Sequence, residues 1–148
     1  MNKNITYISD FFVDHVVGGG ELNDDELIKL LQERKYKVKK TQSHLANLKF
    51  LLDNEDSFFV ISNFCNLSPE SKRWISKNCR YIIYEHDHKY LNTRNPADFE
   101  NFEAPQNAIR DFFFYKGAES VITQSTFHKK IIQDNLGLDN IFSISGNL

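Results

Sequence analysis

Two short stretches of this 148-residue chain hold the side chains best suited to chemistry. The first is a run of four titratable residues: Glu85, His86, Asp87 and His88. If the run is extended, its two histidines share one face and its two carboxylates share the other. Because histidine titrates near neutral pH, either one can act as a general base or hydrogen-bond a substrate hydroxyl. We take His86 as the candidate catalytic residue, and Asp87 and His88 as candidate substrate-binding residues.

Two other interpretations of this run remain open. Two histidines and a carboxylate are acceptable zinc or iron ligands, which would make His86, Asp87 and His88 a metal site. The sequence has no third ligand motif with metal-binding spacing, so we expect no metal. The other interpretation is a polar loop whose histidines cap the ends of strands.

The second stretch is a glycine-rich turn that consists of Gly18, Gly19, Gly20 and Glu21. Successive glycines let the backbone come close to a ligand and adopt positive φ at little steric cost. The acidic residues within 21–26 would repel a phosphate, so a sugar hydroxyl or a neutral acceptor fits here more easily. We expect all four residues to contact substrate. The alternative is a glycine run that only forms a flexible turn.

Neither of two familiar phosphate-binding loops matches this turn. The dinucleotide pattern G-x-G-x-x-G has Asn23 in place of its third glycine, and the glycines begin several residues after the preceding apolar run. A Walker loop requires Gly-Lys-Ser/Thr, which does not follow. We therefore expect no cofactor.

Apolar runs of strand length alternate with amphipathic segments along the chain. The runs lie at 5–8, 58–61, 81–84, 121–122 and 141–144. Their continuous apolar character is typical of parallel strands buried on both faces, and a less regular outer strand is expected within 35–41. The alternation predicts an α/β fold: one three-layer, Rossmann-like domain over 1–148 with a mostly parallel sheet and helices on both faces.

Capping residues predict where several helices begin and end. Asn23, with Glu26 three residues later, forms a capping-box pattern that predicts a helix start at Asn23. Ser68 and Ser125 are similar starts, and Gly137 is typical of a helix end.

Leucine and aromatic spacing predicts two further helices. Over 44–52, leucines at 45, 48 and 52 fall on one stripe. Over 106–117, we expect Ile109, Phe112 and Phe113 to face the core.

Ligands of such sheets bind outside the carboxyl ends of the strands. Three segments of this chain fall there: the loop Gly18–Glu21, the run Glu85–His88, and Gln124 with Ser125. We expect the fold to bring them to one rim, and we add Ser125 to the candidate substrate-binding residues.

Composition excludes several function classes. The net charge is −2, from 20 acidic and 18 basic residues, which gives no electrostatic basis for binding nucleic acid or an anionic membrane. No apolar run approaches the ~20 residues of a transmembrane span, and the N-terminus lacks a signal-peptide pattern. The 13 phenylalanines predict an aromatic-rich core. Cys65 and Cys79 form no C-x-x-C pair, so we expect reduced, buried cysteines in a cytoplasmic protein.

In these stretches the chain resembles the N-terminal domain of retaining GT-B glycosyltransferases of the Gly-Gly-x-Glu type, a family 4-like group. Gly18–Glu21 resembles the family's glycine loop, and Tyr84–His88 resembles its fourth-strand segment, whose histidine faces the sugar-transfer site. Val121–His128 resembles the strand and helix start where the family commonly has a serine. The resemblance implies an acceptor-side domain in which Gly19 and Gly20 approach donor phosphates or acceptor. It also implies that His86, or in the competing assignment His88, contacts the transferred sugar or the acceptor.

The chain also departs from that family. Its members have a second Rossmann-like domain that holds most of the nucleotide-sugar, and this sequence ends at 146–148, about where the linker to it begins. The chain is then a fragment, a half that needs a second domain or subunit, or a domain without transfer activity. Half of a cleft does not by itself exclude water or fix both substrates.

We expect a glycosyltransferase-like domain that binds an acceptor glycan, part of a nucleotide-sugar donor, or both. The alternative is a non-catalytic binding or assembly module, such as a homodimer that covers its cleft face with aromatic residues. A metal-dependent hydrolase is the third interpretation.

Overall fold

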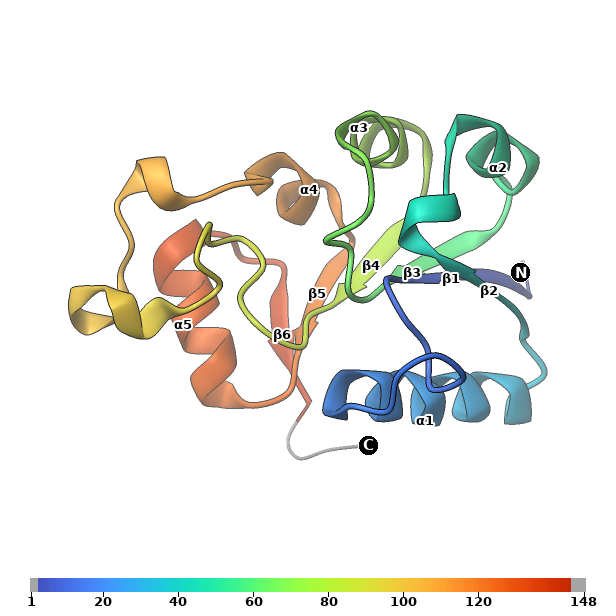
Figure 1. Ribbon diagram of the computed structural model, residues 1–148, viewed down its shortest axis with the longest axis horizontal. Coiled ribbons are helices and arrows are strands. Elements are labelled where there is room, and N and C mark those ends of the chain that lie inside the picture. Colours follow the sequence, from blue (N-terminus) through green and yellow to red (C-terminus); the bar gives the residue numbers. More distant parts are fainter. Residues whose placement is uncertain (1–2, 145–148) are drawn as a thin grey trace.

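The computed structural model describes residues 3–144, and these form a single six-stranded sheet in which all strands are parallel (Figure 1). The strand order is β2-β1-β3-β4-β5-β6. The strands are β1 (Asn4–Ser9), β2 (Lys37–Gln42), β3 (Phe58–Ile61), β4 (Tyr81–Tyr84), β5 (Ser120–Thr123) and β6 (Ile141–Ser143). This architecture confirms the predicted Rossmann-like α/β fold, including the irregular outer strand, which is β2.

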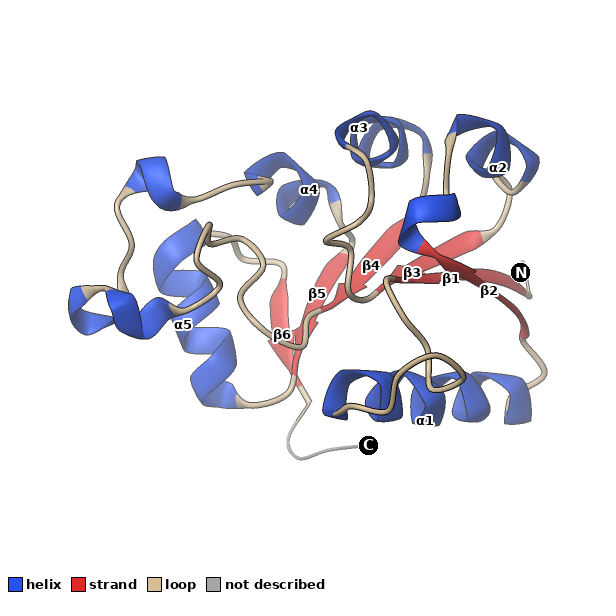
Figure 2. Ribbon diagram, in the orientation of Figure 1, coloured by secondary structure: helices blue, strands red, loops and turns tan. Residues whose placement is uncertain are grey.

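Helices cover both faces of the sheet unequally (Figure 2). Among the described residues, the α-helices are α1 (Gly19–Glu33), α2 (Leu48–Asp53), α3 (Pro69–Asn78), α4 (Phe112–Gly117) and α5 (Thr126–Leu136). α1 lies alone on one face, which we call the α1 face. α2, α3 and α4 lie over the other face, which we call the α3 face. Each helix is too short or too polar to cross a membrane.

The larger hydrophobic core lies under the α3 face. Ile61, Ile83 and Val121 of the central strands are fully buried there, and α5 contributes Ile132 and Leu136 to the same cluster. Aromatic side chains fill much of this core, as the phenylalanine content predicts: Phe59, Phe64, Tyr81, Tyr90, Phe114 and Tyr115. Burying one large apolar side chain contributes about 1.5–3 kcal/mol, so this cluster holds the α3-side helices to the sheet.

A smaller core lies under α1. Tyr7 and Val60 pair across β1 and β3 and pack with Tyr84 against Ile28 of α1. Because α1 is the one described helix on this face, the neighbouring strands β4 to β6 keep partly exposed apolar side chains.

Three of the predicted helix ends are confirmed. Ser68 accepts a hydrogen bond from Ser71 N at the start of α3, and Ser125 accepts one from His128 N at the start of α5. Gly137 ends α5 in the left-handed conformation, with φ of 65°. The predicted start at Asn23 is wrong, because the glycine turn itself forms the first turn of α1: Leu22 N donates to Gly18 O at 3.0 Å.

The predicted helix over 44–52 is also wrong in its extent and its buried face. Asn47 accepts a hydrogen bond from Phe50 N, so α2 begins only at Leu48. This shift turns Leu51 into the core and leaves Leu45 and Leu52 56% and 53% exposed.

The predicted helix over 106–117 is two separate pieces. A 3₁₀ turn over Gln106–Ala108 ends before Asp111, whose φ of 58° breaks the helical path ahead of α4. As a result Phe114 and Tyr115 are buried, whereas Phe112 and Phe113, which were expected to face the core, are exposed.

Candidate functional site

The loops after β1 and β3 meet where the strand order reverses. After β1 the chain crosses to β2 on one side, whereas after β3 it crosses to β4 on the other side. Open α/β sheets bind ligands at the point where the direction of crossing reverses. Asp10 N donates to Asn63 O at 2.8 Å, and the Asp10 carboxylate accepts from Cys65 N and Asn66 N, each at 2.9 Å. The carboxylate therefore fixes the loop that presents Asn63.

Gly20, Asn63 and His86 come together at this rim. A Cβ atom placed on Gly20 would lie 3.3 Å from His86 Cδ2 and 3.3 Å from Asn63 Nδ2. These distances leave a methyl group little room, so any side chain at this position would push His86 or Asn63 aside by a few tenths of an ångström. The expectation that the glycine loop (Gly18–Glu21) and the histidine run (Glu85–His88) share one rim is confirmed.

His86 is held through both of its ring nitrogens. Nε2 lies 3.0 Å from Asp24 Oδ1, and Nδ1 lies 2.6 Å from Gln124 Nε2. Because a carboxylate only accepts, Nε2 carries the proton and Nδ1 accepts from the Gln124 amide. The His86 ring also packs on Tyr84, with 4.5 Å between the ring centroids. Gln124, which follows β5, therefore joins the rim as predicted.

Asp24 is a site residue that the sequence did not single out. It is fully buried in α1 and accepts from Tyr7 Oη at 2.5 Å and from Ser62 Oγ at 2.8 Å, in addition to His86. Burial and the neighbouring Asp24 carboxylate raise the pKa of Tyr7 well above its ordinary value. The available signal was spacing: Asp24 lies one helical turn after Gly20, on the side that faces His86.

A second buried network lies beside the rim, around Lys89. The Lys89 ammonium contacts the Glu85 carboxylate directly and lies 3.1 Å from Asp87 Oδ1 and 3.5 Å from Asn63 Oδ1. Burial lowers the pKa of Lys89 to about 7, and the charges of Cys65, Asp10 and Asp24 act in the opposite direction. Lys89 was missed because an isolated lysine is normally a surface residue.

Other members of the histidine run complete this network. Glu85 is fully buried and also accepts from Tyr115 Oη, while Asp87 accepts from Arg94. Glu85 and Asp87 therefore anchor the segment after β4.

His88 faces a different set of partners from His86. Its Nδ1 lies 2.7 Å from Tyr90 Oη, and its ring packs edge-on against His128 at 4.7 Å between centroids. Burial and the proximity of His128 lower the pKa of His88 to about 4. Burial also lowers the pKa of His128, whose Nε2 donates to Asp87 O at 2.8 Å.

The remaining predicted site residues have varied roles. Gly18 is the N-cap of α1 and lies against the Glu21 carboxylate, which a Cβ on Gly18 would approach to 3.2 Å. A Cβ on Gly19 would have no atom within 4 Å. The Ser125 hydroxyl is occupied in capping α5.

Metal ligands do not gather in the part of the chain that the structure describes. Residues 3–144 contain no group of three or more His, Cys, Asp or Glu side chains placed to hold a metal ion. His86, Asp87 and His88 point to different partners, so the metal-dependent hydrolase has no geometric support. The two cysteines form no disulfide. Cys65 is exposed and Cys79 is only partly buried, contrary to the expectation that both are buried.

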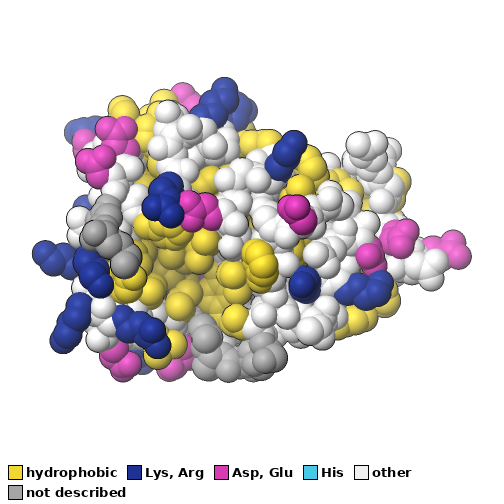
Figure 3. Space-filling model, turned by 180° about the vertical axis from the view of Figure 1, so that it is seen from behind, with side chains coloured by type: hydrophobic (Ala, Val, Ile, Leu, Met, Phe, Trp, Pro, Cys, Tyr) yellow, Lys and Arg dark blue, Asp and Glu magenta, His cyan; other side chains and the backbone are white. Residues whose placement is uncertain are grey.

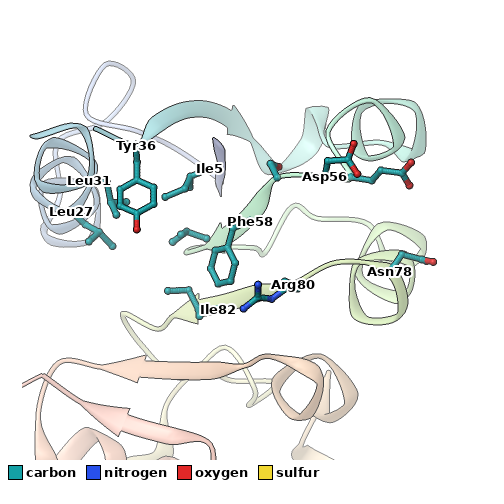
Figure 4. A pocket seen from close by; sticks show the side chains of 12 residues that line it. Ile5, Leu27, Leu31, Tyr36, Asp56, Phe58, Asn78, Arg80 and Ile82 are labelled. Carbon is teal, nitrogen blue, oxygen red and sulfur yellow. The ribbon is translucent and has the colours of Figure 1, made fainter. Parts of the chain in front are cut away.

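A large hollow lies on the α1 face, away from this rim. Figure 3 shows hydrophobic side chains gathered there, with charged side chains around the edge. The hollow has a volume of about 580 Å³; Leu27, Leu31 and Tyr36 form one wall, and Phe58 and Ile82 lie across from them (Figure 4). The sequence did not indicate it, because it arises from the absence of a second helix beside α1 in the described residues.

No protein-family model matches this chain, and no curated protein matches it.

Proposed function

We propose that this domain binds a sugar at the rim formed by Gly20, Asn63 and His86, as half of a sugar-transfer site. The bound group is an acceptor glycan or the sugar end of a nucleotide-sugar. The observation that carries the proposal is the tight fit at Gly20, where an added Cβ would lie 3.3 Å from both His86 and Asn63. This tight fit supports a ligand-binding site, because a glycine turn that only connects two elements does not need it.

The side chains at the rim suit hydroxyl groups better than a phosphate. Asn63 and Gln124 each offer a donor and an acceptor, and Asp10 and Asp24 are carboxylates bonded within the protein. Neutral side chains with both functions match sugar hydroxyls, which also donate and accept.

His86 enters this proposal as a positioned ligand contact. Its Nε2 bonds to buried Asp24, whereas Nδ1 bonds to the Gln124 amide, which is the easier partner to exchange. We propose that a sugar hydroxyl replaces the Gln124 amide at Nδ1 when the ligand binds. The assignment of a catalytic role to His86 stays a prediction.

Transfer itself would require a second half-site. A partner domain or subunit would supply the donor-binding wall, because reacting groups must be held together and shielded from water. For this chain alone we propose binding.

A matched pair of glycine variants tests the proposal. In a ¹⁵N-labelled chain titrated with UDP-glucose, GDP-mannose or free disaccharides, we expect the amides of 18–21 and the His86 ring to shift together. Gly20→Ala should weaken binding about tenfold, since its methyl group displaces His86 or Asn63, a cost of about 1.4 kcal/mol. Gly19→Ala, whose methyl group has open space, is the control and should bind like the parent. Absence of joint shifts with every probe, or equal effects of the two variants, would contradict the proposal.

A second candidate function is an assembly module, with a second copy of this chain as the partner. It is favoured by the apolar side chains left uncovered on the α1 face, including Phe142, which is 48% exposed on the edge strand β6.

A further inference from the structure

A small polar pocket lies beside the rim, on the α3 side of Lys89. It has a volume of about 160 Å³ and is lined by Phe64, Cys65, Lys72, Lys89, Arg110 and Asp111. Pockets for drug-sized ligands usually measure about 300–1,000 Å³, so this one is too small for a sugar or a nucleotide. It has room for a single functional group, such as a phosphate or a carboxylate.

Two buried lysines from different elements converge on this pocket. Lys72 of α3 is 8% exposed and Lys89 is 1% exposed. Their Nζ atoms lie 5.3 Å and 5.1 Å from the centroid of the same Phe64 ring. Burying two like charges around one ring costs free energy unless each is compensated.

The chain compensates the two lysines but not the third cation of the pocket. Lys72 pairs with Asp111 at 2.9 Å, and Lys89 pairs with Glu85 and Asp87. Arg110 donates through Nε to Lys89 O at 3.0 Å, and within residues 3–144 its terminal guanidinium nitrogens have no acceptor. Arg110 is exposed, so its hydrated guanidinium lies at the open side of the pocket, where it is free to pair with a bound anion.

We propose that this pocket binds one oxyanionic group, of a phosphate monoester or a carboxylate, between the Arg110 guanidinium and the Lys72 ammonium. Arginine binds such groups through two parallel N–H donors, and lysine adds a charge-assisted hydrogen bond. The Asp111 carboxylate competes with the anion for Lys72, so we expect the pocket to bind the anion with moderate affinity. This inference goes beyond the proposed function, since it holds whether or not a sugar binds at the rim.

Inorganic phosphate and acetate are the probes that test the site. In a titration of the full ¹⁵N-labelled chain at constant ionic strength, we expect saturable shifts of the Arg110 Nε–Hε signal and the Cys65 amide, with a Kd on the order of millimolar. A response to phosphate alone assigns a phosphate ester, and a response to both assigns any oxyanion. Free glucose should leave these signals unchanged, so a failure at this pocket is separable from a failure at the sugar rim.

Three variants decide whether the pocket is responsible. Arg110→Gln should weaken phosphate binding about tenfold, and Asp111→Asn should strengthen it several-fold because the competing carboxylate is removed. Arg73→Gln changes an exposed arginine on α3 next to Lys72, which does not line the pocket, and it should bind like the parent.

Either of two results would overturn the proposal. One is the absence of saturable shifts up to about 100 mM phosphate, which is far above the expected Kd. The other is an Arg110→Gln variant that titrates like the parent while its circular dichroism shows the native fold.

Discussion

At the scale of single residues, Asp24 connects the second turn of α1 to three other parts of the fold. Its carboxylate is the common acceptor for Tyr7 of β1, Ser62 after β3 and His86 after β4. A carboxylate that is fully buried is stabilised only by such donors, and the donors in turn depend on it. The position of His86 at the rim therefore depends on the Asp24 carboxylate.

Replacing Asp24 should destabilise the chain strongly. Asp24→Ala leaves three buried donors unpaired, so the free energy of unfolding should fall by about 3–5 kcal/mol in urea denaturation. Asp25→Ala is the control: Asp25 pairs with Lys29 on the helix surface, and its loss should cost less than about 0.5 kcal/mol. Equal losses for the two variants would show that the Asp24 contacts contribute little.

His88 makes stability depend on pH between its folded and unfolded pKa values. Its pKa falls from 6.5 in the unfolded chain to about 4 in the fold, so the unfolded chain binds more protons between these values. The stability that neutral His88 contributes is therefore fully present above pH 6.5 and is lost as the pH falls towards 4. His128, Asp87 and Tyr90 are the groups that face His88, and protonation would place a second charge beside His128 when that ring is also charged.

A glutamine variant isolates this contribution. His88→Gln should flatten the pH dependence of the free energy of unfolding, measured by urea denaturation between pH 4 and 7. His44→Gln, at an exposed histidine, should keep the parent's slope. If both variants follow the parent curve, His88 ionises in the fold as it does in the unfolded chain.

At the scale of elements, the end of α4 is fixed by a contact that its own sequence does not reveal. A Cβ on Gly117 would lie 2.6 Å from the hydroxyl of Tyr81, which is fully buried and donates to Phe114 O at 2.7 Å. The hydroxyl has no room to retreat, so the last turn of α4 and β4 must separate if a side chain is added.

Gly117→Ala should therefore be destabilising although alanine favours helices. We expect a loss of about 1–3 kcal/mol in the free energy of unfolding, as for overpacked cores. Lys116→Ala, at the exposed neighbouring position, should change it by less than about 0.5 kcal/mol. An unchanged or raised melting temperature for Gly117→Ala would show that Tyr81 can rearrange freely.

The elements differ in how well they could be predicted from the sequence. The strands were predictable because runs such as Tyr81–Tyr84 are apolar at every position, which parallel sheets require. Caps at Ser68 and Ser125 were predictable because the capping residue bonds locally. The helices near 48 and 112 were misjudged because Asn47 and Asp111 reset their starts, and a shift of a few residues turns a different face to the core.

Some residues of the candidate site could be predicted from the sequence and others could not. Gly20, His86 and Gln124 could be placed on one rim because topology alone brings strand ends together. Asp24 and Lys89 could not. The partners of Asp24 lie 17 to 62 positions away in the chain, and Lys89 is buried against Asn63, 26 positions away, as well as against its near neighbours Glu85 and Asp87.

At the scale of the whole molecule, the sheet is covered by several helices on one face and by α1 alone on the other. On the α1 face, Phe142 of β6 pairs directly with Ile122 of β5, and Ile82 lies diagonally from Ile122 on the neighbouring strand β4. These side chains are only partly buried, and the hollow beside α1 extends the apolar area. Contiguous apolar surface of this kind is where proteins associate.

Phe142→Lys tests whether this face makes the chain associate with itself. In sedimentation velocity, we expect the parent to show a concentration-dependent dimer and Phe142→Lys to remain monomeric, since a lysine at a buried interface is an unpaired charge. Phe113→Lys is a matched control, because Phe113 is 42% exposed but belongs to α4 on the opposite side. A parent that stays monomeric, or a control that acts like Phe142→Lys, would count against assembly through the α1 face and would leave sugar binding at the rim as the function to test. Both lysine variants should unfold near the parent's midpoint, because neither phenylalanine is buried within the folded chain.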